Sequence, residues 1–152
     1  MSDPERPVTE TDSLPGNRTE FQEAGWEIVV VGPCASGKST LAGGLVALGY
    51  QARVVGQEHS EIERLWKRHD PVVVIGLQAS LDTVRRRRGR NWPEAVYERQ
   101  QRRLAPAMAA AVVVIDTGEL STLATLATAA AAIRDAGIHA SPGSDARPGG
   151  PI

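Results

Sequence analysis

The chain has 152 residues, a formal net charge of −1 and 23% charged residues, so its length suits one domain and its charge attracts neither nucleic acid nor an anionic membrane. Because Cys34 is its only cysteine, no internal disulfide can form, and a reducing compartment is expected. No apolar run is long enough to cross a bilayer, and the acidic N-terminus does not resemble a signal peptide. We therefore expect a cytoplasmic protein without a membrane partner.

Both ends of the chain differ in composition from its middle. Residues 1–24 and 139–152 combine proline, glycine and polar residues without an apolar period. Such segments cannot bury enough apolar surface to offset the entropy of the chain, so we expect two disordered tails. The folded domain is predicted to span residues 25–138.

The first predicted elements of this domain are a strand and a helix. Residues 28–31 (IVVV) form a β-branched run that is typical of a buried parallel strand. Leu41, Leu45 and Leu48 then follow at spacings of four and three, which places them on one face of a helix. Gly49 is suited to a left-handed cap at the end of that helix.

Residues 32–39, between this strand and this helix, read GPCASGKS and match the pattern G-x-x-x-x-G-K-[ST]. In a strand–loop–helix context the pattern predicts a phosphate-binding loop, because the helix N-terminus has N–H groups without internal partners. Lys38 is expected to reach the β- and γ-phosphates, and the Ser39 hydroxyl to hold Mg²⁺. The predicted ligand is a nucleoside triphosphate, and its expected contacts are Gly32, Pro33, Cys34, Ala35, Ser36, Gly37, Lys38, Ser39 and Thr40.

A second strand and a second helix are predicted next. Residues 52–55 form a short strand closed by Gly56, and Ser60 with Glu63 fits a capping box for a helix over residues 60–69. The apolar face of that helix would carry Ile62, Leu65 and Trp66. Residues 72–77 are apolar throughout and predict a central strand.

The following helices are marked by their end signals. Ser80 can cap a helix that carries four consecutive arginines, and Gly89 breaks that helix. Pro93 suits the first turn of the next helix, whose buried face would include Val96, Gln100 and Leu104. Because Pro106 is unfavourable inside a helix, we expect a kink or a restart there.

The last elements complete an alternating pattern. Residues 112–115 form a fourth strand, and Ser121 can cap a final helix that ends at Gly137. Strands that alternate with helices predict an α/β fold, here a small three-layer α/β/α domain with a mostly parallel sheet of about four strands. The inward face of the final helix is expected to carry Leu123, Leu126, Ala130 and Ile133.

Together with the loop, the segments from residue 72 onward resemble nucleoside-monophosphate-kinase-like P-loop NTPases, and within that group dephospho-coenzyme A kinase and other small-molecule kinases. The similarity covers residues 26–136 and rests on the strand at 72–77, the sequence LQAS at 77–80, the arginine-rich helix, QQRR at 100–103 and AVVVIDT at 111–117. A GTPase would need an Asn-Lys-x-Asp motif, which the chain lacks. The resemblance implies ATP as the nucleotide and an arginine lid over it, with that role assigned first to Arg88 and Arg90 and then to Arg85.

Two features depart from that family. Its members place an Asp-x-Asp or similar motif after the second strand, where this chain reads GQEHS at residues 56–60. Glu58 could act there as a general base or an outer Mg²⁺ ligand, and His59 could hold substrate; both could equally be polar residues before a helix. Family members also have a further strand before the lid, for which this sequence predicts no counterpart. Asp116 could replace its acidic residue, but a turn with Thr117 and Gly118 is the better interpretation.

Three hypotheses for the function follow. The first is a kinase that transfers the γ-phosphoryl group of ATP to a small molecule, with Lys38, Glu58 and Arg88 as its catalytic residues. The alternative is a regulatory module that binds ATP and hydrolyses it weakly or not at all. A nucleic-acid-binding switch that uses the arginine run is the least favoured. Cys34 is interpreted as a small loop residue rather than a redox thiol, Trp26 and Trp66 as core, and Trp92 as a base-stacking or hinge residue.

Overall fold

The computed structural model describes residues 27–68 and 70–140, so Trp26 and most of the two expected tails lie outside the described residues. Four parallel strands form one sheet in the order β3-β2-β4-β5. The strands are β2 (Glu27–Val31), β3 (Gln51–Val54), β4 (Val73–Gln78) and β5 (Val113–Asp116). The predicted α/β class with a four-stranded parallel sheet is therefore confirmed.

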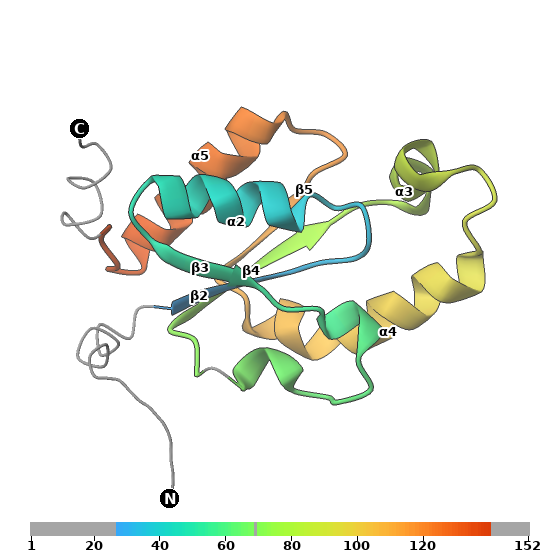
Figure 1. Ribbon diagram of the computed structural model, residues 1–152, viewed down its shortest axis with the longest axis horizontal. Coiled ribbons are helices and arrows are strands. Elements are labelled where there is room, and N and C mark those ends of the chain that lie inside the picture. Colours follow the sequence, from blue (N-terminus) through green and yellow to red (C-terminus); the bar gives the residue numbers. More distant parts are fainter. Residues whose placement is uncertain (1–26, 69, 141–152) are drawn as a thin grey trace, which may run out of the picture.

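Helices cover both faces of this sheet (Figure 1). The helices α2 (Lys38–Ala47) and α5 (Thr122–Asp135) lie on one face, and α4 (Glu94–Ala110) lies on the other. The short α3 (Leu81–Arg88) extends beyond the carboxyl end of β4. Within the described residues, none of the helices is both long and apolar enough to span a bilayer.

Alternation along the strands divides the core into two layers. Ile28 and Val30 of β2 pack into the cluster beneath α2 and α5, whereas Val29 and Val31 pack into the cluster beneath α4. All four side chains are fully buried. A strand that is buried on both faces needs apolar residues at every position, which explains why residues 28–31 are uniformly β-branched.

The expected capping residues occupy the expected places. The Ser80 hydroxyl accepts the Thr83 N–H at 3.1 Å, and the Ser121 hydroxyl accepts the Ala124 N–H at 3.0 Å. Each bond satisfies an N–H that the first helical turn leaves without an internal acceptor, at a gain of ~1 kcal/mol. Gly49 and Gly137 adopt the left-handed conformation after α2 and α5, with φ of 101° and 87°.

The predicted helix over residues 60–69 is wrong. The described part of this segment contains only two 3₁₀ turns, η1 (Gln57–His59) and η2 (Leu65–Lys67). The Ser60 hydroxyl accepts the Ile62 N–H at 2.9 Å rather than the amide of Glu63. The buried Gln57 side chain accepts the Trp66 N–H at 3.0 Å and donates to the Ile62 carbonyl at 2.8 Å, so it supplies bonds that a helix would have made internally.

Two smaller expectations also need correction. Of the kink or restart expected at Pro106, the restart does not occur, since Pro106 lies inside the continuous α4, and the nearby Leu104 and Ala107 are buried in the core beneath that helix. The carbonyl that loses its partner belongs to Arg102, which is exposed and can be hydrated. Leu123 of α5 is 75% exposed instead of facing the core, whereas Ala130 and Ile133 are buried as expected.

Candidate functional site

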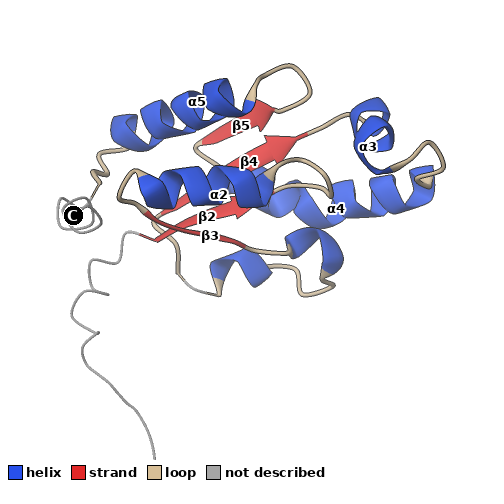
Figure 2. Cartoon of the chain, turned by 45° about the horizontal axis from the view of Figure 1, so that its top comes forward, coloured by secondary structure: helices blue, strands red, loops and turns tan. Residues whose placement is uncertain are grey.

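The carboxyl ends of all four strands meet at one edge of the sheet, because the strands are parallel (Figure 2). The connections that leave this edge are residues 32–37 (the glycine-rich loop), the segment with η1, the turn before α3, and residues 117–121 before α5. Since β3 lies directly beside β2, η1 begins next to the glycine-rich loop. No further strand separates β3 from β4 among the described residues, as the sequence had indicated.

Close packing and left-handed backbone shape the glycine-rich loop. A Cβ on Gly32 would lie 2.6 Å from the Ser36 Oγ and 3.0 Å from the Leu77 carbonyl oxygen, so only glycine fits there. Gly37 has a φ of 94° and precedes the first residue of α2. Gly37 has no side chain with which to cap the helix, so the first N–H groups of α2 remain available to a ligand.

Lys38 connects this loop to the segment after β3. Its ammonium donates to the carbonyl oxygens of Gly32 and Pro33, each at 3.0 Å. The same nitrogen lies 2.8 Å from the Glu58 Oε2. The ammonium is thereby held at the mouth of the loop by three acceptors, whereas the neighbouring Ser39 and Thr40 side chains are exposed.

Glu58 is a buried carboxylate with unequal oxygens. Its side chain is 3% exposed, and its Oε2 lies near both the Lys38 ammonium and, at 3.5 Å, the His59 Nε2. Its Oε1 has no hydrogen-bond partner within the described part of the chain. A buried carboxylate with one unused oxygen can accept a proton or bind a cation. In the structure, the Lys38 ammonium compensates the negative charge of Glu58.

Cys34 is fixed in the loop by a side chain of α4. The buried Gln100 accepts the Cys34 N–H on its Oε1 at 3.1 Å, and its amide nitrogen lies 3.3 Å from the Cys34 Sγ. The same sulfur lies 3.5 Å from the His59 Nε2. The Cys34 thiol therefore contacts two polar side chains from other segments.

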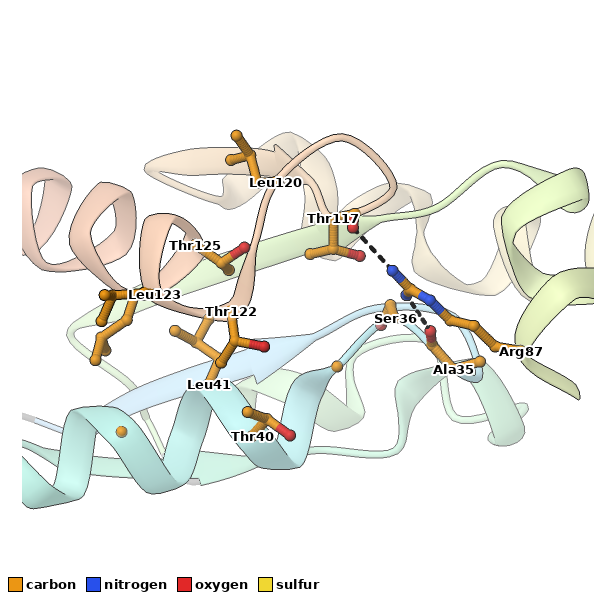
Figure 3. Close-up of a pocket in the computed structure, with 13 residues that line it drawn as sticks. Ala35, Ser36, Thr40, Leu41, Arg87, Thr117, Leu120, Thr122, Leu123 and Thr125 are labelled. Carbon is orange, nitrogen blue, oxygen red and sulfur yellow. Dashed lines mark hydrogen bonds between the residues drawn. The ribbon is translucent and has the colours of Figure 1, made fainter.

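A cavity of about 730 Å³ opens on the other side of the loop. Its walls come from the loop, from the first half of α2 and from the start of α5 (Figure 3). They offer apolar carbon atoms together with several hydroxyl groups, a combination suited to a flat heterocycle with polar edges. The lining residues include Thr40, Leu41, Arg87, Leu120, Leu123 and Leu126.

Arg87 fixes one side of this cavity (Figure 3). Its guanidinium donates to the carbonyl oxygen of Ala35 at 2.6 Å and to that of Thr117 at 2.9 Å. Because Ala35 belongs to the loop and Thr117 follows β5, a single side chain of α3 joins two of the four connections. A run of four consecutive arginines carries no sequence signal that would select Arg87 among them.

The arginines expected to form the lid lie elsewhere in this structure. The Arg85 Nε donates to the Trp92 carbonyl at 3.0 Å, and the Arg88 guanidinium lies 5.6 Å from the centre of the Trp92 ring. Arg85 and Arg90 line a separate cavity of about 830 Å³ at the end of α3. None of these three forms a hydrogen bond or an ion pair with the glycine-rich loop among the described residues; Arg85 and Arg88 contact Trp92 instead.

Three further residues, Asp116, Trp66 and Tyr97, stabilise the fold through a turn, core packing and a hydrogen bond. The Asp116 carboxylate accepts the Gly118 N–H at 2.9 Å, which confirms the turn interpretation. Trp66 is 8% exposed and packs in the core beneath α4. The Tyr97 hydroxyl of α4 donates to the Ala79 carbonyl at 2.9 Å, and burial, followed by the charge of Asp116, raises the pKa of Tyr97 above 10.0.

Neither a protein-family model nor a curated protein matches this sequence.

Proposed function

We propose that the protein binds ATP with Mg²⁺ at the glycine-rich loop and transfers the γ-phosphoryl group to a small molecule. The observation that carries this proposal is the Lys38 ammonium, held at the mouth of the loop by the Gly32 and Pro33 carbonyls beside Glu58. A fixed cation next to the unpaired amides of a helix N-terminus favours a polyphosphate.

The neighbouring residues fit the other parts of the nucleotide. The cavity between α2 and α5 is large enough for a base and a ribose, and its leucines supply apolar contacts for a ring. The buried Ser36 Oγ has no partner among the described residues and can therefore donate to an oxygen of the ligand. The exposed Ser39 hydroxyl would hold Mg²⁺, which neutralises the charge of the phosphates when bound.

Glu58 is the residue best suited to accept a proton from the attacking group. It follows the strand beside β2, lies next to Lys38 and has an unused oxygen. A further cavity of about 370 Å³ beside η1 is lined by three arginines and two glutamates, Arg99, Arg102, Arg103, Glu61 and Glu63. Arg103 lies 3.5 Å from Glu61, so Arg99 and Arg102 are the groups that would contact an anionic acceptor there. Phosphoryl transfer depends mainly on positioning and on electrostatics, which Lys38, Mg²⁺ and Glu58 would supply here.

Transfer of labelled γ-phosphate from ATP to a panel of metabolites, followed by mass spectrometry, tests this proposal. A general base contributes about 10²- to 10⁴-fold to kcat, so Glu58→Gln should slow transfer by that factor while ATP still binds. Glu119→Gln is the matched control, because Glu119 is an exposed glutamate in the connection before α5.

The second candidate is a regulatory module that binds ATP without transferring phosphate. It is favoured by the positions of Arg85 and Arg88, which contact Trp92 rather than the loop. ATP binding without transfer or hydrolysis, unchanged by Glu58→Gln, would overturn the kinase proposal and support this module.

A further inference from the structure

Three side chains of different chemistry meet beside the glycine-rich loop. Cys34 comes from the loop itself, whereas Glu58 and His59 come from η1 after the neighbouring strand. One ligand atom from each, the sulfur, a carboxylate oxygen and an imidazole nitrogen, lies within 4.8 Å of the other two. The described residues contain no other such group of three.

The distances suit a small ion with tetrahedral ligands. The Cys34 Sγ and the Glu58 Oε2 each lie 3.5 Å from the His59 Nε2. Bonds of about 2.0–2.3 Å to a tetrahedral zinc ion place neighbouring ligand atoms roughly 3.3–3.8 Å apart. The two separations from His59 fall inside that range, and the Cys34 Sγ and a Glu58 carboxylate oxygen lie within 4.8 Å of each other.

The kinds of ligand favour zinc over magnesium. A thiolate with an imidazole and a carboxylate is a donor set typical of Zn²⁺, whereas Mg²⁺ prefers oxygen ligands alone. Three protein ligands also leave a fourth position open to water or another small ligand.

Two further observations point to a bound cation. The Glu58 side chain is 3% exposed, yet its Oε1 has no partner in the part of the chain that the structure describes. The Gln100 amide nitrogen lies 3.3 Å from the Cys34 Sγ, where it can donate to a thiolate and orient it. The Gln100 amide thus supports the Cys34 sulfur, and one oxygen of the buried Glu58 carboxylate is unused.

We propose that Cys34, Glu58 and His59 form a zinc site beside the glycine-rich loop. When Zn²⁺ binds, the thiol proton of Cys34 leaves to solvent, and the sulfur forms the bond to the metal as a thiolate. With Lys38 still charged, the group then gains one positive charge in total. The His59 side chain is 63% exposed, so the ion can reach the site from solvent on the side of His59.

This site has a consequence that rests on the proposed kinase function. A Glu58 carboxylate bound to zinc cannot accept a proton from an acceptor molecule, so Zn²⁺ should inhibit phosphoryl transfer. Zinc binding itself requires neither ATP nor catalysis, and the two proposals can therefore fail separately.

Cobalt substitution in the full, nucleotide-free chain is the test. Because Cys34 is the only cysteine, a thiolate-to-cobalt charge-transfer band can arise from no other residue. We expect that band, together with the visible absorption of tetrahedral Co²⁺, at one equivalent of metal, and Zn²⁺ should abolish both. Competition with a chromophoric chelator then measures the affinity for Zn²⁺.

Variants identify the ligands. Loss of a supporting group around a metal ligand costs about 10- to 100-fold in affinity, so loss of a ligand in Cys34→Ser or His59→Gln should cost at least about 100-fold. His139→Gln is the matched control, because His139 is also exposed but lies after α5. Since the His59 side chain is mostly exposed, His59→Gln keeps the test valid even if Cys34→Ser fails to fold. An octahedral cobalt spectrum without the thiolate band, or equal zinc affinity in His59→Gln and the parent chain, would overturn the proposal.

Discussion

Two neighbouring strands of one sheet are followed by connections of opposite character. After β2, glycines allow a tight loop that leads into a regular helix, α2. After β3, the chain forms two 3₁₀ turns whose backbone is held by the buried Gln57 side chain. The two connections meet where Lys38 contacts Glu58. A functional group can therefore be positioned either by local backbone geometry or by a tertiary hydrogen bond, and only the first leaves a clear sequence motif.

The largest effect is expected when the connection after β3 loses its side-chain support. Gln57→Leu keeps a side chain of similar size but leaves the Trp66 N–H and the Ile62 carbonyl without their hydrogen-bond partner. The buried Trp66 N–H should cost about 1–3 kcal/mol when unsatisfied, and the lost bond to the carbonyl of the exposed Ile62 about 1 kcal/mol, so we expect the free energy of unfolding to fall by about 2–4 kcal/mol in urea titrations. Gln51→Leu, on an exposed strand position, should change it little, and equal effects of both variants would contradict this role of Gln57.

A second variant tests whether the connection after β2 depends on glycine itself. Gly32→Ala forces a Cβ to 2.6 Å from the Ser36 Oγ, and such overpacking should cost about 1–3 kcal/mol in thermal or urea unfolding. Gly43→Ala is its control, because a Cβ there meets nothing within 4 Å inside α2 and should stabilise the helix by about 0.5–1 kcal/mol. Opposite signs of the two effects are predicted, and the same sign in both would count against the close packing of the loop.

The arginine that contacts the loop should matter more for ATP affinity than its neighbours. Arg87→Gln removes the bonds to the Ala35 and Thr117 carbonyls that fix the cavity wall, and we expect about tenfold weaker ATP binding, or ~1.4 kcal/mol. Arg88→Gln, which loses only a contact with Trp92, should bind ATP nearly as well as the parent chain. The reverse order in fluorescence or calorimetric titrations would restore the lid role predicted for Arg88.

The smallest effect concerns the connection that leads from β4 to α3. Tyr97→Phe removes the hydrogen bond to the Ala79 carbonyl and should destabilise the protein by ~1 kcal/mol near neutral pH. Because burial and Asp116 raise the pKa of Tyr97 in the folded state above 10.0, its protonated form stabilises the fold below that pH, and the contribution is lost as pH rises through the raised pKa. Above about pH 10, the free energy of unfolding of the variant should therefore fall less steeply with pH than that of the parent chain.

The sequence predicted the parts of the molecule that depend on local chemistry. β-branched runs marked the strands, and Ser80, Ser121, Gly49 and Gly137 marked helix ends because each satisfies or permits a particular backbone conformation. The motif at residues 32–39 also located the loop and Lys38 at the carboxyl edge of the sheet.

Contacts between distant segments could not be predicted in the same way. Ser60 and Glu63 carry a valid capping pattern, but the bonds from Gln57 to residues farther along the chain override it. The selection of Arg87 depends on how α3 is oriented against residues 117–121, which no local pattern encodes. The contact of Cys34 with His59 likewise exists only because β3 lies beside β2.

Binding of the ATP phosphates by Lys38 and the glycine-rich loop can be measured by calorimetric titration with Mg²⁺–ATP in zinc-free buffer. We predict saturable binding that Lys38→Met weakens about 10- to 150-fold, because the charged hydrogen bond that it removes contributes about 1.5–3 kcal/mol. Lys67→Met is the matched control, since Lys67 is exposed and lies over the Trp66 ring, and it should bind ATP as the parent chain does. Equal affinity of the Lys38→Met and parent chains, or no binding at about 1 mM ATP, would rule out a phosphate site formed by Lys38 and this loop.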